Sequence, residues 1–479
     1  NGRRAKLPPG PRGLPILGSL PVLGSNPHQS LYTLSKRYGG LMYLKIGTTP
    51  AVIASSLEAA TAILKTFDNN FCNRAPYGGA AADILLYDKS DITMSSNWPM
   101  LRKLCVVHLL SPKCVDEWLD SRDEEMAVLL ASIFKQRAGS AVNVGDFVTI
   151  FTSNVISQMM MKMRIFEDNN EEAAHFRDLM DEFLSIIGGF RIEDYVPFLG
   201  KIGFGASQLR EMKNLHKRID EFLGRNIREH SLMPTNEKKK DFVEILEALK
   251  SDSHGELSDA NIKGILLNMF SAGTDTATRT VEWAMSELIR HPHIMKRLRE
   301  EIDSEVGVER RVKECDLPRL KYLTAVVTET LRLHPPTPLM LPHASGQATT
   351  VLGHFIPQNT RVMVNVWAIA RDPNLWERPL EFDPDRFVGS PVNLHGTDFR
   401  VIPFGAGRRM CPGHNLGLRM VSFALASFIH AFEWTLPAPQ NPQDLDMSEK
   451  YEISIHRKVP LDLFATPRLP AHLYLYNNK

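Results

Sequence analysis

The sequence predicts a mainly α-helical protein with a small β portion, folded as a single large domain. Most of the chain carries apolar residues at helical spacing, and two short runs near the N-terminus have the character of strands. Beyond Pro335 the pattern changes to short apolar runs interrupted by Pro, Gly and Asn, which is typical of strands and irregular loops. No linker of distinct composition separates the two parts, so we expect one domain.

The overall composition is that of a globular protein with a large core. Of 479 residues, 43% are hydrophobic and 23% are charged, which is ordinary for this class. Lys and Arg number 56 against 55 Asp and Glu, so the net charge of +1 gives no overall field that would recruit nucleic acid. Five cysteines are too few for a disulfide framework and indicate a reducing compartment. No run of about 18 apolar residues is present, so we expect no membrane span within this sequence.

Residues 1–18 differ from the rest in composition. Three basic residues precede Pro8-Pro9-Gly10-Pro11, and prolines at this density fix the backbone and remove hydrogen-bond donors. A stiff, extended segment is therefore expected, either as a hinge or as a plain linker. The sequence has no initial methionine, which indicates a truncated or processed form. After this segment, strands are expected at residues 41–46 and 51–54, with a turn at residues 47–50 between them.

A long helix with a defect in its middle is expected from residue 258 onwards. Ser258 can cap it, and an apolar face at helical spacing follows from Ile262 to Phe270. That face is interrupted by Ala272-Gly273-Thr274-Asp275-Thr276-Ala277, where Gly273 costs roughly 1 kcal/mol against alanine. The Thr276 hydroxyl can bond the Ala272 carbonyl and bend the helix. Such a gap suits a small ligand and an ordered water; the alternative is a close helix crossing with Asp275 in solvent.

A second helix carries a charged pair. Asp316 and Pro318 predict its start, and Pro335-Pro336 enforces its end. Glu329 and Arg332 are spaced three apart, so their side chains are neighbours, as in many solvated surface pairs. Arg386, which follows later in the chain, would turn this pair into a three-member ionic cluster that holds a loop to the helix.

The strongest chemical signal is the glycine-rich loop at residues 404–413 around Cys411. Its three glycines allow close approach of the backbone, and Arg408 and Arg409 favour the thiolate form of the cysteine. A lone cysteine is a poor start for a zinc site but suffices as a single axial ligand of haem iron. A helix expected from about residue 415 to 432 would favour the thiolate through its dipole. An inert buried cysteine is the alternative.

The small-residue stretch of the first helix, the charged pair of the second helix and the glycine-rich loop follow one another along the chain, and together they resemble the motifs of cytochrome P450s. The pattern Phe-x-x-Gly-x-Arg-x-Cys-x-Gly ends at Gly413, Glu-x-x-Arg lies at Glu329, and Ala-Gly-x-Asp-Thr ends at Thr276. The resemblance covers the chain from Pro8 to about Leu475. It implies the P450 fold for residues 19–479, with residues 1–18 as the hinge after a missing N-terminal anchor.

The resemblance also implies a haem b cofactor and a role for each matching residue. Cys411 would be the iron ligand, with haem contacts from Trp98, Arg102, His343, Phe404 and Arg409; Trp98 and Arg102 would lie one turn apart on a helix capped near Asn97. Asp275 and Thr276 would relay protons to dioxygen, with Asp275 facing away from Thr276 and reaching solvent. Glu329, Arg332 and Arg386 would form a structural ionic cluster away from the substrate.

In finer detail the chain is similar to plant microsomal flavonoid 3′-hydroxylases and 3′,5′-hydroxylases. Supporting stretches include Asn365-Val366-Trp367-Ala368-Ile369 and Gly396-Thr397-Asp398-Phe399. It departs from them at Ala277, where Ser or Thr is usual, at Pro412, where Ala is usual, and at residues 388–391, which lack a Gly-Gly-Glu-Lys run. Substrate contacts are expected from the segment 76–93 and from two later regions, at Leu85, Leu86, Asn268, Met269, Ala272, Thr337, Leu339, Met340, Ile453 and Ser454.

The activity implied is hydroxylation of a plant phenolic, a flavonoid B-ring above all, by insertion of one oxygen atom from O₂. Electrons would come from NADPH through NADPH–cytochrome P450 reductase, at the cytosolic face of the endoplasmic reticulum membrane. A terpenoid or other specialised metabolite is the alternative substrate. Two other classes stay open, a non-redox haem-thiolate isomerase or dehydratase and a haem-binding sensor or carrier, and the Asp275–Thr276 pair speaks against a sensor.

Overall fold

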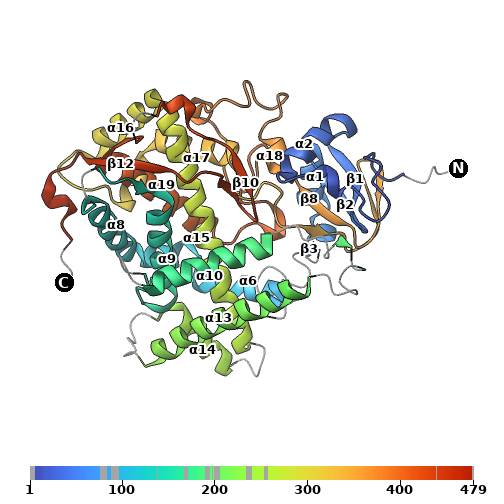
Figure 1. The fold of residues 1–479 in the computed structure, drawn as a ribbon, viewed down its shortest axis with the longest axis horizontal. Helices are drawn as coiled ribbons and strands as arrows, with labels where there is room; N and C mark the ends of the chain where they lie inside the picture. Colours follow the sequence, from blue (N-terminus) through green and yellow to red (C-terminus); the bar gives the residue numbers. More distant parts are fainter. Residues whose placement is uncertain are drawn as a thin grey trace.

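The computed structural model has the mainly helical architecture that the sequence predicts, with a small β portion whose strands lie partly at one end of the molecule and partly among the helices (Figure 1). It describes residues 6–75, 84–87, 97–136, 139–166, 171–188, 195–196, 198, 205–232, 240–252, 257–437 and 440–476. The longer helices are α2 (Pro27–Tyr38), α6 (Trp98–His108), α8 (Leu119–Phe134), α9 (Val144–Met161), α10 (Glu171–Gly188), α13 (Ala206–Ser231), α14 (Phe242–Asp252), α15 (Asp259–Arg290), α16 (Pro292–Val306), α17 (Lys321–Leu333) and α19 (His414–Ala431).

Short helical turns connect these helices and the strands. They are α1 (Leu20–Leu23), α3 (Leu57–Thr61), η1 (Ala62–Thr66), α4 (Asp68–Phe71), α7 (Pro112–Glu117), η2 (Glu314–Arg319), α18 (Val366–Ile369), η3 (Pro384–Phe387), η4 (Gly407–Arg409), η5 (Pro442–Asp444) and η6 (Ala471–Tyr474). The strands are β1 (Leu41–Ile46), β2 (Thr49–Ala54), β3 (Asn73–Arg74), β4 (Val142–Asn143), β5 (His343–Ala344), β6 (Thr349–Val351), β7 (His354–Ile356), β8 (Arg361–Val364), β9 (Phe432–Thr435), β10 (Glu449–Tyr451), β11 (Ile455–Arg457) and β12 (Asp462–Pro467).

The largest sheet combines strands from the N-terminal part of the chain with strands from residues 343–364. Its order is β1-β2-β8-β5-β3, with β2 and β8 parallel and the other neighbours antiparallel. The two strands expected at residues 41–46 and 51–54 are confirmed as the antiparallel pair β1 and β2, but β2 begins at Thr49, so the turn covers residues 47–48 and not the expected 47–50. Residues 6–18 lie against this sheet: Tyr43 N donates to Pro9 O over 2.9 Å, and Gly18 forms a bridge with Ile46.

Helix α15 runs through the helical mass and packs against α9, α19, α17, α13 and α16 (Figure 1). The predicted cap is confirmed, because Ser258 Oγ accepts from Asn261 N and the Asn261 side chain accepts from Ser258 N. The helix is continuous from Asp259 to Arg290, so the expected defect does not interrupt it. At Gly273 the neighbouring helix α9 comes close: an added Cβ would lie 2.6 Å from Ile156 Cδ1. Gly273 therefore marks a close helix crossing and also lines a cavity, but Asp275 is buried and not in solvent as the second interpretation had it.

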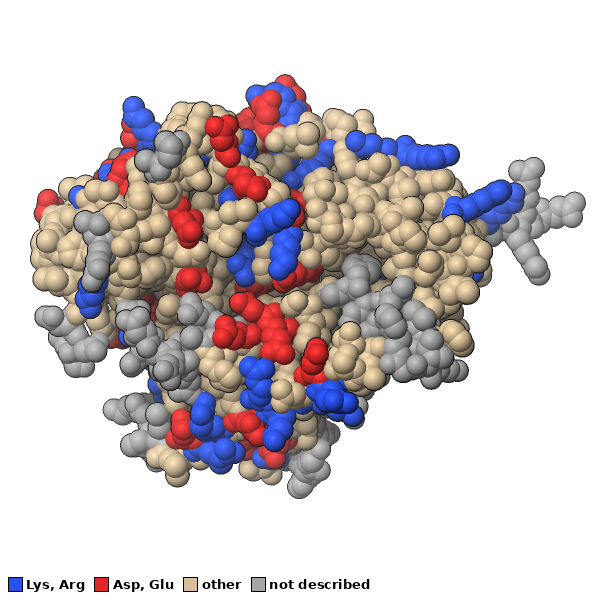
Figure 2. Space-filling view, viewed as in Figure 1, with Lys and Arg blue, Asp and Glu red and all other residues tan. Residues whose placement is uncertain are grey.

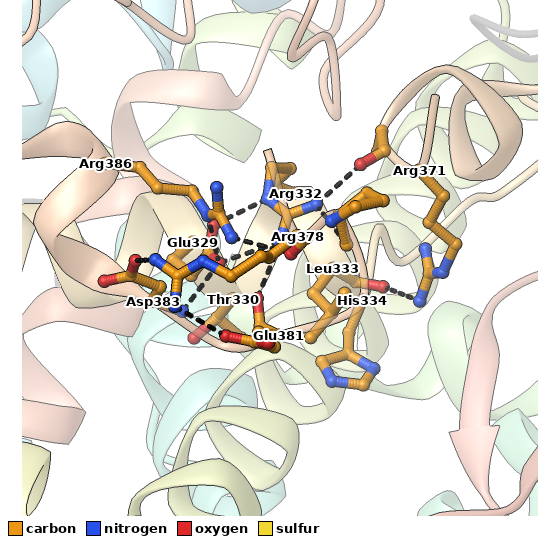
Figure 3. Close-up of polar contacts among 12 residues, drawn as sticks. Glu329, Thr330, Arg332, Leu333, His334, Arg371, Arg378, Glu381, Asp383 and Arg386 are labelled. Carbon is orange, nitrogen blue, oxygen red and sulfur yellow. Dashed lines mark hydrogen bonds and ion pairs between the residues drawn. The ribbon is translucent and has the colours of Figure 1, made fainter. Parts of the chain in front are cut away.

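The predicted charged pair lies in a buried cluster that ties α17 to the segment before η3 (Figure 3). Arg332 donates to both carboxylate oxygens of Glu329, over 2.6 and 2.8 Å, and its remaining N–H groups reach the carbonyls of Ala370, Pro379 and Glu381. Arg386 Nε lies 3.4 Å from Glu329 Oε1. The expectation of a solvated surface pair is therefore wrong, and the three charges form one cluster.

The start of α17 differs from the prediction. Asp316 and Pro318 belong to the 3₁₀ turn η2, and α17 begins only at Lys321. Asp316 accepts from Lys313 N over 2.9 Å and pairs with Arg310 and Arg319, so it caps the turn and not the helix. Capping residues and Pro are equally suited to either kind of helical turn, and the sequence pattern does not separate them.

The surface carries both signs of charge. On the face shown in Figure 2, Lys and Arg side chains lie among Asp and Glu, as the balanced count of the sequence leads one to expect. Among the helices that the structure describes, none combines the length and apolar character needed to cross a bilayer.

Replacing Glu329 tests the cluster. Glu329→Gln removes the negative charge but keeps the shape, and it should lower the free energy of unfolding by about 3–5 kcal/mol because Arg332 is left buried without its counter-charge. The matched control is Asp385→Asn, which breaks the pair between Arg297 and Asp385, side chains that are 49% and 57% exposed. In this control the free energy of unfolding should fall by less than about 1 kcal/mol. Denaturant titration of both variants is the measurement, and equal losses would contradict a special role for the buried cluster.

Candidate active site

An apolar cavity, called the main cavity below, lies along one side of α15. Helix α15, the N-terminal turns of α6 and α19, and the glycine-rich loop all contribute to its walls. The loop contributes Cys411, α15 contributes Thr276, and most other lining residues are apolar. The cavity therefore brings together two of the three motifs that the sequence singled out, the small-residue stretch of α15 and the glycine-rich loop, whereas Glu329 and Arg332 do not line it.

The glycine-rich loop places Cys411 by a set of backbone bonds. Cys411 N donates to Phe404 O over 2.9 Å, and Met410 N donates to Gly407 O over 3.1 Å. Gly405 and Gly407 have φ of 72° and 68°, a region that favours glycine. At Gly407 an added Cβ would also lie 2.5 Å from the backbone oxygen of Leu64. The loop is thus held against η1 and α4, and it leads directly into α19, which begins at His414 rather than at the expected residue 415.

Burial and two neighbours set the charge state of Cys411. Burial raises the pKa of the Cys411 thiol above its usual value, and the Gly413 backbone N–H and the Arg102 guanidinium lower it without cancelling the effect of burial. The prediction that Arg408 and Arg409 supply the favourable charge is wrong, because the Arg408 side chain is 60% exposed and faces Asp68, and the Arg409 guanidinium lies over the Trp98 ring. The helpful cation comes instead from α6, which no pattern near Cys411 reveals.

One end of the cavity is rich in cations. Arg74, Arg102 and Arg409 all line it, together with Trp98 and His343. The Arg409 guanidinium lies 3.7 Å from the centroid of the Trp98 ring and donates from Nε to Cys72 O over 2.8 Å. Burial lowers the pKa of Arg74 to about 9, with help from the nearby charge of Arg409. Sequence reasoning missed Arg74, which pairs with His343 across β3 and β5, a register that its local sequence does not reveal.

His343 is held in a neutral form. Its Nδ1 lies 2.6 Å from Phe71 O, and because a carbonyl only accepts, Nδ1 carries the hydrogen. Burial and the charges of Arg74 and Arg409 lower the pKa of His343 to about 3. Nε2 is then an acceptor, so in this state His343 cannot donate to a carboxylate and is the weakest of the predicted haem contacts.

The lining fits haem b in its donor set and its charge. A thiol that can serve as axial ligand lies in an apolar cavity, and the described lining contains three arginines but no Asp or Glu. Two propionates would supply the missing negative charge at the cationic end. All six predicted haem contacts, Trp98, Arg102, His343, Phe404, Arg409 and Cys411, line this one cavity. Among the described residues there is no cluster of His, Cys, Asp and Glu that would hold a separate metal ion.

Helix α15 presents Thr276 to the cavity. The Thr276 hydroxyl donates to Ala272 O over 2.7 Å, as predicted, which leaves its oxygen free to accept a hydrogen bond. Asn268, Met269, Ala272 and Gly273 line the same wall. The residue opposite to them on the helix is Asp275.

The prediction that Asp275 reaches solvent is wrong. Its exposed fraction is 7%, and it lies on the far side of α15 from Thr276, as expected for adjacent residues. Asp275 Oδ1 lies 3.1 Å from Arg279 Nε and 3.5 Å from His456 Nε2, and Asp275 Oδ2 accepts from Ser454 Oγ. Although burial opposes it, the sum of these partners lowers the pKa of Asp275.

The predicted substrate contacts divide into two groups. Asn268, Met269, Ala272, Thr337 and Met340 line the main cavity. Of the others, all of which the structure describes, none lines it: Leu85 and Leu86 lie in the principal core, Leu339 packs in a smaller core with β1 and β2, Ile453 packs against the principal core, and Ser454 faces Asp275. Apart from residues 84–87, the segment 76–93 lies outside the described residues.

Comparison with known proteins places these observations in a family. The family model of cytochrome P450 matches residues 8–460. A flavonoid 3′,5′-hydroxylase of Eustoma exaltatum subsp. russellianum is 42% identical over 99% of this chain and 94% of its own length. A flavonoid 3′-monooxygenase of Crocosmia x crocosmiiflora is 44% identical over 98% and 94%, and one of Arabidopsis thaliana is 40% identical over 98% and 93%.

The crowding at Gly407 gives a direct test of the loop. Gly407→Ala should lose haem content and stability, because alanine adds a backbone clash to the cost of positive φ. Gly353→Ala is the matched control, since Gly353 also has positive φ but has no atom within 4 Å of an added Cβ. The free energy of unfolding of this control should fall by only about 1–2 kcal/mol, and its haem content should not change. Thermal unfolding and the ratio of haem to protein absorbance separate the two, and full haem content in Gly407→Ala would contradict this account.

Proposed function

The chain belongs to the cytochrome P450 family and is a haem-thiolate monooxygenase, and we propose that its substrate is a flavonoid that it hydroxylates on the B-ring. The observation that carries the proposal is the single cavity that joins Cys411, the cationic end and the wall of α15 around Thr276. The printed names of the relatives, flavonoid 3′-monooxygenase and flavonoid 3′,5′-hydroxylase, supply the substrate class.

The residues of the chain divide the work around the cofactor. Bound haem activates dioxygen and supplies the oxygen atom that enters a C–H bond, with electrons from NADPH through a reductase. Cys411 would hold the iron, and Arg74, Arg102, Arg409 and Trp98 would hold the propionates through charge and hydrogen bonds. The apolar wall excludes water from the reacting atoms.

The lining also suits a flat phenolic molecule. Met269, Ala272 and Met340 give an apolar surface, and Asn268 and Thr337 add polar groups that could orient ring hydroxyls. Ala277 and Pro412, two departures from the flavonoid hydroxylase pattern, line the same cavity. They favour, as a second candidate, a terpenoid or another apolar skeleton with the same reaction.

Thr276 and Asp275 are proposed to deliver protons. Cleavage of the O–O bond of dioxygen consumes protons in a cavity that is otherwise too apolar to supply them. The Thr276 oxygen can accept a hydrogen bond from a water or another proton donor, since its own hydrogen is used on Ala272 O. Asp275, on the other side of the helix, would be the point at which protons enter.

We further propose the cytosolic face of the endoplasmic reticulum membrane as the site of action, with an anchor that precedes residue 1 and residues 1–18 as the hinge. The similarity to plant microsomal P450s supports this. Microscopy of the full-length protein fused to a fluorescent marker tests it, and a signal spread through the cytosol would contradict it.

Turnover tests the substrate. Reconstituted with haem, reductase and NADPH, the protein should convert naringenin to its B-ring catechol, and Cys411→Ala should give no product and no strongly red-shifted Soret band with carbon monoxide. Product that forms without NADPH would indicate a non-redox isomerase, and the absence of any turnover would indicate a sensor. Turnover of a terpenoid without flavonoid product would replace the flavonoid as substrate.

Thr276→Ala tests proton delivery. The variant should keep haem content and substrate binding, but electrons from NADPH should appear as hydrogen peroxide, because loss of acid assistance costs about 10²-fold or more in the productive step. Thr278→Ala is the matched control, since Thr278 lies on the same helix but faces Thr149 over 3.3 Å. If Thr276→Ala forms as much product per NADPH as the wild type, Thr276 has no role in proton delivery.

A further inference from the structure

A second cavity lies on the other side of α15 from Thr276. Helices α9, α10 and α15 and the β10–β11 region enclose it, and Asp275, Arg279 and His456 line it. Helix α15 is thus a common wall, with Thr276 on the main cavity and Asp275 on the second one. Figure 1 shows α15 with α9, α10 and β10 around it.

We propose that this second cavity is the entry for protons and that Ser454 and His456 pass them to Asp275. The inference rests on the proposed role of Asp275 and Thr276 in proton delivery and adds the route by which Asp275 is supplied. Ser454 and His456 act through Asp275 and are therefore positioning residues.

The three side chains form a chain of hydrogen bonds. His456 Nε2 lies 2.9 Å from Ser454 Oγ, and Ser454 Oγ bonds Asp275 Oδ2. The direct distance from His456 Nε2 to Asp275 Oδ1 is 3.5 Å, too long for a good hydrogen bond. The shortest connection from the imidazole to the carboxylate therefore passes through the Ser454 hydroxyl.

The direction of the chain follows from the donors available. An ionised Asp275 only accepts, so the Ser454 hydroxyl donates to it, and the Ser454 oxygen then accepts from His456 Nε2–H. When the imidazole takes up a proton from water at Nδ1, it can release the one at Nε2 to Ser454 while Ser454 passes its own to Asp275. One proton enters at His456 Nδ1 and one proton reaches Asp275, so the number of protons balances.

Protonation would also free Asp275 to move. The ion pair with Arg279, at 3.1 Å, holds the carboxylate on the far side of α15. A neutral Asp275 carboxyl loses that attraction. Arg279 then keeps a partner in Glu282, whose Oε2 lies 3.6 Å from Arg279 Nη1. Rotation about the Asp275 side chain could then carry the proton toward the main cavity, so charge and movement are coupled.

Other buried histidines of the described chain are bonded differently. His28 bonds Glu449 directly over 2.8 Å, and His334 bonds Glu287 directly over 2.7 Å. Such direct pairs serve as ties between elements. His456 reaches its carboxylate through a hydroxyl and lines the same cavity as that carboxylate, which suits proton transfer better than a tie.

The pH dependence follows from the groups around His456. Burial is the largest effect and lowers the pKa of His456 below its ordinary value; Arg279 and Lys450 also lower it, and Asp275 and Glu452 raise it without reversing the shift. The charged residues that line this cavity are Asp146 on α9, Asp181 on α10, Asp275, Arg279 and Glu282 on α15, and Lys450, His456, Arg457 and Lys458 after them. Because the protonated fraction of an imidazole falls as pH rises through its pKa, proton supply should weaken with rising pH.

The test compares variants that keep or remove proton transfer. Because the pKa of His456 is lowered from its ordinary value of about 6.5, product per NADPH in the reconstituted enzyme should fall as pH rises through a range that lies below about 6.5. His456→Gln keeps an N–H donor but cannot carry a proton, so it should abolish this pH dependence and lower product per NADPH about 10-fold at the acidic end. Ser454→Ala should do the same, and Ser454→Thr, which restores the hydroxyl, should recover the wild-type profile. His430→Gln, a buried histidine that bonds Gly307 O, is the matched control.

A second readout does not depend on turnover. NMR titration of the histidines in the resting enzyme should show a lower His456 pKa in Asp275→Asn, since the negative neighbour is lost. If His456→Gln and Ser454→Ala keep the wild-type coupling and pH profile while Asp275→Asn and Thr276→Ala uncouple, the inference is overturned and the proposed function stands. If Asp275→Asn and Thr276→Ala also stay coupled, the proposed proton delivery fails as well.

Discussion

Three guanidinium groups line an apolar cavity to which the described residues contribute no carboxylate, and this imbalance of charge constrains the rest of the protein. A buried cation without a counter-charge is costly, and burial lowers the pKa of both Arg74 and Arg102. A ligand with two carboxylates removes the imbalance, so haem binding stabilises the folded chain by linkage. The same Arg102 opposes in part the rise in pKa that burial causes in the Cys411 thiol. One surplus of positive charge thereby serves both ends of a single cofactor.

Helix α15 separates two chemically different spaces. Its small residues face an apolar cavity suited to an uncharged substrate, while Asp275 and Arg279 face a cavity with many ionisable groups. Adjacent residues on a helix point in different directions, so Thr276 and Asp275 cannot share one space. A reaction that needs both dry surroundings and protons thus has each requirement met on its own side of the helix.

The sequence allowed the helical fold, the Ser258 cap, the Cys411 loop and the neighbours Glu329 and Arg332 to be predicted, because each is a short pattern with a local physical cause. What it could not supply is the result of contacts between distant segments. Asp275 is buried because Ser454 and His456, about 180 positions away, close over it. Arg74 joins the cationic end through a strand pair with His343, and Arg102 replaces Arg408 beside Cys411 for the same reason.

One side chain, that of Ile156, sets both the shape of the substrate cavity and the distance between α9 and α15 at their close crossing. Ile156 lines the cavity and also fills the space above Gly273, where no Cβ is present. A smaller residue at this position would enlarge the cavity and at the same time leave a void between the helices. At this position, a change that makes room for a larger substrate would therefore also lower the stability of the protein to heat.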